Sequence, residues 1–378
     1  MLFRSENKSL AQVYTYNRVN MKNIPKNSIT YSSKLCDLCG TELNNETYKY
    51  CPSCGNEVID YSISATQSFI NAASQGRSES WRYLVGILLA LLIWQLIGPL
   101  PFLGACGALS RVEILGFNCD LSHMSITGPS LVPGFSLTML TFIIGLIGLK
   151  WTIKWIHKRG LLQVLTGRSQ FDLNRFFFSS IVVFAFSFLS LLAGLTIGDS
   201  DVLGGQITRN SVGIDWIFLS VVAIVLVPIQ AGTEELFFRG YVLQGLTRLT
   251  KNRLFLALVT SLIFTSVHIA NPEPWEYGVS AYIISIFLMS LFMSLITLFD
   301  GGLELAIGFH TMNNLWSFLI LGLEKAVIPT TTLFTLNVAS LDTVNAIIPG
   351  IVQFALLFGI FTWRYKWFNK KISFTEGS

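Results

Sequence analysis

Two adjacent glutamates in a long apolar stretch are the side chains of this sequence best suited to transfer a proton. Glu234 and Glu235 follow the run WIFLSVVAIVLVPI, and Arg239 comes four residues after Glu235. On a helix, Glu235 and Arg239 share one face with the acid nearer the N-terminus, the order that favours an ion pair. Glu234 is rotated by about 100° from Glu235 and has no evident local partner, so the two carboxylates should differ in their affinity for a proton. The alternative is a structural salt bridge between helices with a spare glutamate beside it.

Two histidine patterns further along the chain could complete such a site. Phe264-Thr-Ser-Val-His268 and His310-Thr-Met-Asn-Asn314 both lie within apolar runs. His310 and Asn314 share a helix face, so an imidazole and a carboxamide can donate hydrogen bonds to one acceptor. Each pattern also has a simpler explanation, because a lone histidine is often a satisfied core residue and polar side chains often join membrane helices. Ionisable groups inside membrane helices nevertheless tend to mark functional sites.

Helix geometry predicts that two of these three patterns lie at the same depth. The helices that carry Glu234 and His268 should form a hairpin that turns near Lys251, which lies 17 residues from each of them. At 1.5 Å per residue, both side chains then lie about 25 Å from the turn. His310 comes eight residues after the turn at 301–302, or about 12 Å along its own helix. A simple count therefore places the third pattern at a shallower depth, unless its helix starts deeper in the protein.

The elements that must position these residues are membrane-spanning helices. Of the 378 residues, 52% are apolar and only 13% are charged, against about 25% charged in a soluble globular chain. From Trp81 onward the chain consists of apolar runs of about 17–25 residues, the length that crosses a bilayer as a helix. We predict an all-α polytopic membrane protein with about eight transmembrane helices. The predicted spans are 83–103, 135–156, 176–198, 214–236, 254–270, 279–299, 303–322 and 345–366.

The distribution of lysine and arginine over the loops predicts the orientation of the spans. Basic segments follow the second, fourth and eighth spans, at 150–175, 239–253 and 364–371, whereas the other loops hold few cations. By the positive-inside rule the basic segments are cytoplasmic. We therefore expect a multi-pass protein of the cell membrane with both termini in the cytoplasm. The net charge of +4 is small for this length and gives no reason to expect a nucleic-acid partner.

Four of the six cysteines form two C-x-x-C pairs ahead of the first span. Cys36-Asp-Leu-Cys39-Gly and Cys51-Pro-Ser-Cys54-Gly have the spacing of two zinc knuckles that together supply four thiolates. A module of about 25 residues buries too little apolar surface to fold alone, so the metal would stabilise it. Two disulfides are the alternative, which a cytoplasmic location disfavours. We predict a structural zinc ribbon whose metal has no open coordination position for catalysis.

The chain therefore divides into four predicted parts. They are a disordered basic tail (1–33), the zinc ribbon (34–58), a polar, serine-rich linker (59–80) and a multi-pass membrane domain (81–370). The two remaining cysteines, Cys106 and Cys119, fall in the first outer loop. A disulfide between them and two free thiols are equally compatible with the sequence.

The glutamate and histidine patterns together resemble the CPBP family of membrane proteases. E-E-x-x-x-R, F-x-x-x-H and H-x-x-x-N occur intact and in that order within residues 170–322, on successive predicted spans. The family comprises CAAX proteases and bacteriocin-processing enzymes and is also called the Abi or type II CAAX prenyl endopeptidase family. The basic stretch 159–175 is similar to one often seen upstream in the family, whereas many members lack a zinc ribbon.

The resemblance implies intramembrane hydrolysis of peptide bonds by an activated water. Glu234 would be the general base, helped by His268, and His310 and Asn314 would form the oxyanion site. These roles agree with what amide hydrolysis requires, namely an activated water and donors aimed at the developing negative charge. A membrane-embedded site would also exclude bulk water and strengthen both interactions.

The resemblance gives the second glutamate a supporting role. Glu235 and Arg239 would hold their helix in place and tune the catalytic glutamate. Two glutamates and two histidines could instead bind a catalytic zinc ion. Glu235 is expected to be committed to Arg239, however, and the sequence lacks an H-E-x-x-H helix. We therefore favour a mechanism without a catalytic metal.

Two other functions fit parts of the sequence. A non-catalytic membrane scaffold or receptor could bind a protein partner through the zinc ribbon. A transporter could use the buried ionisable residues as a proton relay, although no pair of broken helices is evident. For the protease, the expected substrate is a membrane-associated peptide or protein in the lipid bilayer. A prenylated CAAX tail, a bacteriocin leader and a membrane-anchored regulator all fit.

Overall fold

The computed structural model describes residues 65–109, 116–121, 125–197, 206–337 and 343–368, together with 34–35, 42–43 and residue 53. The chain forms two units, Met1–Ser62 and Ile63–Ser378. In the first unit, strands β1 (Lys34–Leu35) and β2 (Glu42–Leu43) pair in antiparallel orientation. The four cysteines of the expected ribbon, Cys36, Cys39, Cys51 and Cys54, lie outside the described residues. Their binding of zinc therefore stays a prediction.

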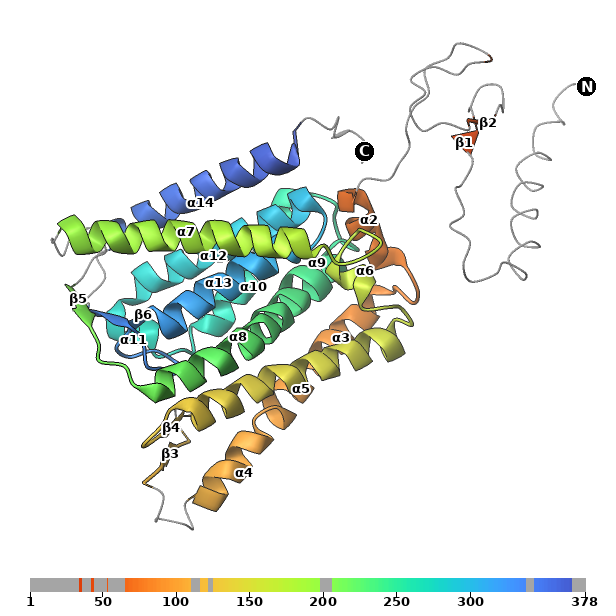
Figure 1. The fold of residues 1–378 in the computed structure, drawn as a ribbon. Helices are drawn as coiled ribbons and strands as arrows, with labels where there is room; N and C mark the ends of the chain where they lie inside the picture. Colours follow the sequence, from red (N-terminus) through yellow and green to blue (C-terminus); the bar gives the residue numbers. More distant parts are fainter. Residues whose placement is uncertain are drawn as a thin grey trace, which may run out of the picture. The chain divides into compact units, whose positions relative to one another are not determined.

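The second unit is a bundle of long helices (Figure 1). Two of the passes are composite. One is α3 (Ser80–Leu92), which continues through the π-helical η3 (Ile93–Ile97) into α4 (Leu100–Leu109), and the other is α8 (Ile214–Glu235), which continues as the π-helical η5 (Leu236–Val242) and α9 (Leu243–Leu246). The remaining passes are α5 (Val132–Ile156), α7 (Leu173–Ile197), α10 (Arg253–His268), α12 (Val279–Asp300), α13 (Glu304–Leu319) and α14 (Thr343–Tyr365). Shorter helices are α2 (Ala65–Asn71), η2 (Ala72–Ser74), α6 (Leu162–Leu165) and α11 (Glu273–Tyr277). Within the described residues, each of the eight predicted spans corresponds to one helical pass, which confirms the all-α membrane fold.

Six of the helical passes in the described ranges are long and apolar enough to cross a bilayer. The other two, α10 and α13, have 16 residues each and are shorter than the predicted spans 254–270 and 303–322. Helix α13 carries polar side chains such as Glu304 that its neighbours bury. On α7, by contrast, Ile181 and Leu189 are each 64% exposed, as expected of a helix that faces lipid.

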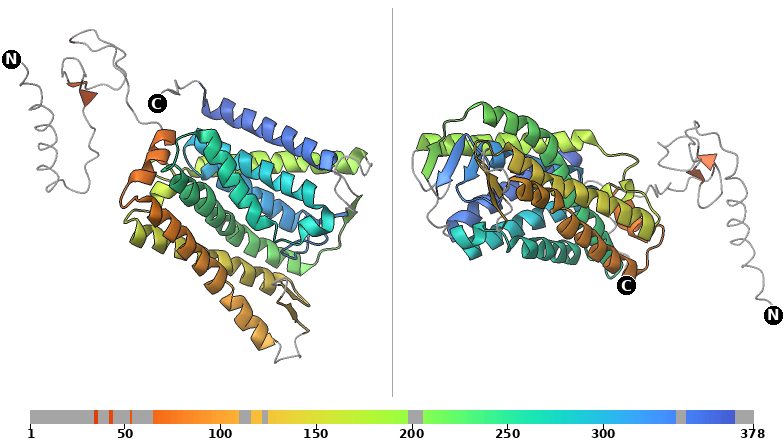
Figure 2. Two further views of the ribbon diagram at one scale, coloured as in Figure 1. Left: turned by 180° about the vertical axis from the view of Figure 1, so that it is seen from behind. Right: turned by 90° about the horizontal axis from the view of Figure 1, so that it is seen from below.

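Two small sheets lie at the end of the bundle opposite α2 (Figures 1 and 2). Strands β3 (Asn118–Asp120) and β4 (Ser125–Thr127) form an antiparallel hairpin. Strand β7 (Phe334–Asn337) is central in the second sheet, antiparallel to β5 (Gln206–Arg209) and parallel to β6 (Leu321–Leu323). A disulfide joins Cys106 of α4 to Cys119 of β3. Of the two alternatives that the sequence left open, the structure therefore has the disulfide.

The segment before the first span differs from the linker predicted at 59–80. Residues 65–74 form α2 and η2, and we call the stretch 65–77 the strap. Phe69 and Ile70 are 0% and 3% exposed, so two apolar side chains fix the strap to the membrane domain. The polar composition that suggested a linker belongs to the other face of this short amphipathic segment.

Hydrogen bonds and close backbone packing hold the strap against α12 and α9. The Thr66 hydroxyl donates to the carbonyl of Phe299 (3.1 Å), and the Gln244 amide donates to the carbonyl of Phe69 (3.1 Å). Gly301 ends α12 with a φ of 77° and packs directly on the strap backbone, so that a Cβ atom there would clash. Glycine is required at this position both for its backbone conformation and for the close approach.

His157, directly after α5, holds the far end of the strap. Its Nδ1 lies 2.8 Å from the carbonyl of Arg77 and its Nε2 lies 2.6 Å from the hydroxyl of Tyr241. The carbonyl can only accept, so Nδ1 carries the proton and Nε2 accepts from Tyr241. Burial lowers the pKa of His157 to about 4, with a smaller effect from the cation of Arg159. The imidazole is therefore neutral at pH 7.

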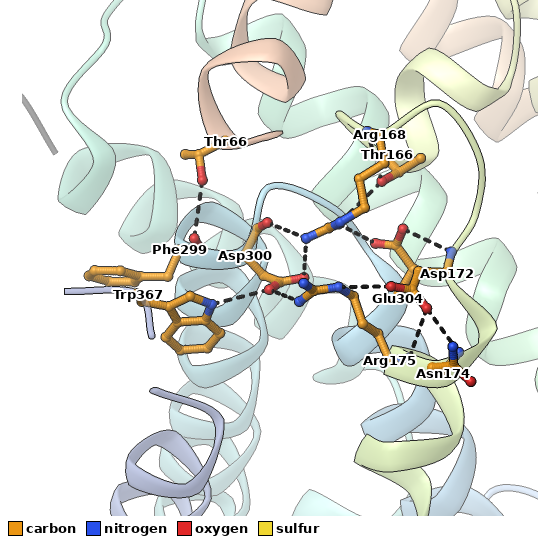
Figure 3. Close-up of polar contacts among 10 residues, drawn as sticks. All are labelled: Thr66, Thr166, Arg168, Asp172, Asn174, Arg175, Phe299, Asp300, Glu304 and Trp367. Atoms are coloured by element: carbon orange, nitrogen blue, oxygen red, sulfur yellow. Dashed lines mark hydrogen bonds and ion pairs between the residues drawn. The ribbon is translucent and has the colours of Figure 1, made fainter. Parts of the chain in front are cut away.

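Buried ion pairs join the start of α7 and the segment before it to the end of α12 and the start of α13 (Figure 3). Asp300 pairs with Arg168 (2.9 Å) and Arg175, and it accepts a hydrogen bond from the indole of Trp367 (3.1 Å). Glu304 pairs with Arg168 at 3.2 Å. The side chains of Asp300 and Glu304 are 1% and 0% exposed. Two cations of the basic loop after the second span are thus committed to carboxylates of the bundle.

Substitution of Phe69 should show that the strap is part of the membrane domain. Because Phe69 is fully buried, Phe69→Ala should lower the free energy of unfolding by about 3–5 kcal/mol. Thermal unfolding of the purified protein in detergent measures the change. Gln67→Ala, on the exposed face of the same helix, should change stability by less than about 0.5 kcal/mol. Equal stability of the two variants would contradict the docking of α2.

Acidification should destabilise the strap through His157. Its folded pKa of about 4 lies below the ordinary 6.5, so the unfolded chain takes up the proton first. The contribution to stability is complete above pH 6.5 and is lost as the pH falls toward 4, by about 2–4 kcal/mol. Unfolding midpoints between pH 7.5 and 4.5 should fall less steeply in His157→Gln than in the parent protein. Parallel curves for the two proteins would rule out this assignment.

Candidate active site

The two glutamates lie where α8 changes into a π-helix. Glu234 and Glu235 are the last residues of α8, and Arg239 lies within η5. The expected ion pair is present, because Nη1 of Arg239 lies 3.0 Å from Oε1 of Glu235 and both side chains are 0% exposed. π-Helical turns are rare and often occur at functional sites.

Three other helices contact this ion pair. Nη2 of Arg239 donates to the hydroxyl and the carbonyl of Ser290 on α12. The guanidinium also lies 4.1 Å from the ring centroid of Phe264 on α10, a cation–π contact. From α13, Nδ1 of His310 donates to Oε1 of Glu235 (2.8 Å). The pair thus fastens α8 to α10, α12 and α13 at one point.

Glu234 has partners that the sequence interpretation missed. Nε2 of Gln230, one turn earlier on α8, donates to Oε1 of Glu234 (2.9 Å). The second carboxylate oxygen, Oε2, lies 3.6 Å from Nε2 of His310. The expectation that Glu234 lacks a local partner was therefore wrong. A search for charged partners overlooks a glutamine at i−4, although such amide pairs are a known helix pattern.

His310 lies at the depth of the glutamates, because its helix starts deeper in the protein than the simple count assumes. The reason is the position of the turn at 301–302, from which the count began. This turn lies beneath the strap and beside α6: Gly302 pairs with Thr166, and the Leu303 amide donates to the carbonyl of Leu165 (2.8 Å). Helix α13 therefore begins inside the protein, and the three sequence patterns meet.

His268 is oriented by its own helix. Its Nδ1 donates to the carbonyl of Phe264 (2.7 Å), and its ring stacks on the Phe264 ring with centroids 4.2 Å apart. Because Nδ1 carries the proton in this bond, neutral His268 has its lone pair on Nε2. The Phe264 ring is also 6.3 Å from that of His310. The phenylalanine of the F-x-x-x-H pattern is therefore shared by both histidines and by Arg239.

Asn314 is held by two other amide side chains. Its Nδ2 donates to Oε1 of Gln230 (2.9 Å), and its Oδ1 accepts from Asn313 (3.3 Å). Within the part of the chain that the structure describes, one of the two N–H groups on Nδ2 is used in this way. The other is available to a ligand.

The site has two residues that no sequence pattern singled out. Gln230 joins Glu234 to Asn314, and Ser290 holds Arg239. In the part of the chain that the structure describes, no three His, Cys, Asp or Glu side chains are grouped as metal ligands. Oε1 of Glu235 already accepts from both Arg239 and His310. What the arrangement offers chemically is a buried carboxylate, Glu234, beside two imidazoles and a carboxamide.

Removal of one charge from the ion pair should be more damaging than removal of both. Arg239→Met leaves a buried carboxylate without its cation and should lower the free energy of unfolding by about 3–5 kcal/mol. The double variant Glu235→Gln, Arg239→Met removes the charge and should recover part of that loss. Unfolding midpoints of both proteins in the same detergent measure the difference. A double variant less stable than Arg239→Met would show that the pair is not coupled in this way.

Comparison with known proteins gives a match to one protein family over a region that contains all six expected site residues. These are Glu234, Glu235, Arg239, His268, His310 and Asn314. Residues 214–316 match the type II CAAX prenyl endopeptidase Rce1-like family. The chain is also 28% identical over 242 residues to the uncharacterized protein YyaK of Bacillus subtilis (strain 168), which covers 64% of this chain and 78% of YyaK. No solved structure matches the chain. The region from α8 to α13 is therefore similar to a family of membrane endopeptidases.

Proposed function

We propose that this protein is an intramembrane endopeptidase that hydrolyses a membrane-associated substrate with a water activated by Glu234. One observation carries the proposal: among the described residues, Glu235 is paired with a cation, whereas the adjacent buried Glu234 contacts an amide and an imidazole instead. A carboxylate that is buried but not neutralised by a cation is well suited to take a proton from water. The Rce1-like match over the same residues supports this reaction class.

The proposed reaction begins with a water between Glu234 and His268. Oε2 of Glu234 takes a proton from the water, and the oxygen forms a bond to the carbonyl carbon of the substrate. The negative charge moves to the carbonyl oxygen, which accepts a hydrogen bond from the free N–H of Asn314. The C–N bond then breaks, and the proton held by Glu234 passes to the leaving nitrogen. The products are a carboxylic acid and an amine, and the site returns to its starting state.

The two histidines would have separate parts in this reaction. His268, whose Nδ1 is bound to the carbonyl of Phe264, would accept a hydrogen bond from the water through Nε2 and so orient it. His310 lies between the two glutamates, 2.8 Å from Oε1 of Glu235 and 3.6 Å from Oε2 of Glu234. Its Nδ1–H is used by Glu235, so it would stabilise the carboxylate of Glu234 and assist Asn314 at the oxyanion in its doubly protonated form, through the second N–H on Nε2.

Further proposals concern the orientation and the N-terminal head. Eight helical passes return the chain to the α2 end, and cations such as Lys158, Arg248 and Lys251 cluster there. This distribution supports a cytoplasmic location for that end and for both termini. We propose that Cys36, Cys39, Cys51 and Cys54 hold a structural zinc ion, on the basis of their spacing. The ribbon would then be available to a cytoplasmic protein partner.

Substitution of Glu234 tests the proposed reaction. In proteoliposomes that contain an internally quenched, farnesylated CAAX peptide, Glu234→Gln should reduce cleavage by about 100- to 10,000-fold, because the general base is lost. His268→Ala should also reduce it, by at least about 10-fold. Glu276→Gln, which removes an exposed glutamate paired with Lys325, serves as the control and should cleave normally.

The same variants separate the competing functions. Membrane peptides that accumulate in a strain with Glu234→Gln, identified by mass spectrometry, would give the natural substrate if the CAAX peptide is not cleaved. Unchanged peptide profiles and unchanged cleavage in both Glu234→Gln and His268→Ala would refute the protease. If deletion of residues 1–60 abolishes the cellular function while Glu234→Gln preserves it, the protein is a scaffold that acts through its zinc ribbon.

A further inference from the structure

Gln230 connects two side chains of the site that belong to different helices. Its Nε2 donates to Oε1 of Glu234 on its own helix, and its Oε1 accepts from Nδ2 of Asn314 on α13, both at 2.9 Å. Gln230 itself is only 4% exposed, so water does not compete for these bonds. A single carboxamide therefore uses both of its ends within the site.

The charge of Glu234 determines the direction of this chain of hydrogen bonds. An ionised carboxylate only accepts, so the amino group of Gln230 must face it and the carbonyl of Gln230 must face Asn314. Asn314 must then turn its own amino group toward Gln230, and its carbonyl accepts from Asn313 (3.3 Å). The carboxamide of Asn314 thereby presents an N–H, not a carbonyl, to the site. This is the orientation that an oxyanion requires.

The same contact distinguishes the two oxygens of Glu234. Oε1 is occupied by the amide of Gln230, whereas Oε2 faces His310 across 3.6 Å. That distance exceeds a direct hydrogen bond. A proton taken up by Glu234 would therefore be held on Oε2, and the bonds of Gln230 would stay intact with the glutamate in either protonation state.

We propose that Gln230 is a positioning residue that directs the proton to Oε2 of Glu234 and turns the amide of Asn314 toward the oxyanion. The inference rests on the proposed peptidase function, in which Glu234 and Asn314 act on the substrate and Gln230 acts through both. In this proposal, the buried amide of Gln230 aligns the base Glu234 on α8 with the oxyanion donor Asn314 on α13. Neither role needs Gln230 to touch the substrate.

Replacement of Gln230 by an apolar residue of similar length tests the proposal. Gln230→Met removes a donor to a charged group, so kcat should fall about 10- to 100-fold while KM changes less than about 3-fold. The acidic limb of the pH–rate profile should move to higher pH, because the ionised form of Glu234 loses a hydrogen bond. The assay is cleavage of the farnesylated peptide in proteoliposomes of the full chain.

A second substitution predicts the opposite pH dependence. In Gln230→Glu, the introduced carboxyl group, while protonated, can donate to Glu234 and accept from Asn314, as glutamine does. Activity should therefore be nearly normal at low pH and be lost as the pH rises and two ionised carboxylates face each other. A purely structural role would give both variants the same loss at every pH. An unshifted acidic limb in Gln230→Met, or equal profiles for the two variants, would overturn the proposal.

Controls separate the failure of this inference from the failure of the proposed function. Thr233→Val removes another buried hydroxyl from α8, which lies 2.7 Å from the carbonyl of Ile229 and 3.2 Å from that of Phe142, and should leave the pH profile unchanged. If Glu234→Gln still cleaves, the peptidase function itself fails. If Glu234→Gln is inactive but Gln230→Met has the parent's kcat and profile, only the role of Gln230 fails.

A measurement without substrate gives an independent test. The infrared carbonyl band of protonated Glu234, assigned by its disappearance in Glu234→Gln, can be titrated in proteoliposomes. In Gln230→Met this band should persist to higher pH than in the parent protein. Superimposable titrations would contradict the proposal even if no cleavable peptide is found.

Discussion

The buried ion pair of Glu235 and Arg239 is the interaction on which the rest of the membrane domain depends. Both side chains are fully buried, and either charge alone would be costly in surroundings this apolar. Their further contacts come from Ser290, His310 and Phe264, one residue from each of three other helices. Because α10, α12 and α13 each contribute a contact to this ion pair, the pair restricts the depth and the rotation of all three helices relative to α8.

This constraint is also what makes the two glutamates chemically different. Glu235 is paired with the cation of Arg239 and is bound from a second side by His310. Glu234, the next residue on the helix, contacts Gln230 and, at a longer distance, His310. The two helix faces thus supply different partners to adjacent identical residues: a cation to Glu235, and an amide and an imidazole to Glu234.

The periodicity and composition of the sequence predicted the helices and one ion pair, but they could not predict the contacts between segments far apart in the chain. Apolar runs predicted the eight helical passes, and the i, i+4 spacing predicted the pair of Glu235 and Arg239. The simple count placed His310 too shallow because it assumes a turn at the membrane surface, whereas the turn at 301–302 is covered by the strap. Gln230 was missed because an uncharged amide gives no signal until its partner from α13 is known.

The π-helical segment η5 joins the site to the α2 end of the protein. A π-helix has more residues per turn than an α-helix, so it shifts the side chains that follow it relative to those before it. Before and within the shift, Glu235 and Arg239 face α10, α12 and α13. After it, Tyr241 meets His157 and Gln244 meets the strap. The two glutamates and Gln244, which binds the strap, therefore lie on one continuous helix. A displacement of the strap would therefore act on the helix that carries both glutamates, as well as on α12 and His157.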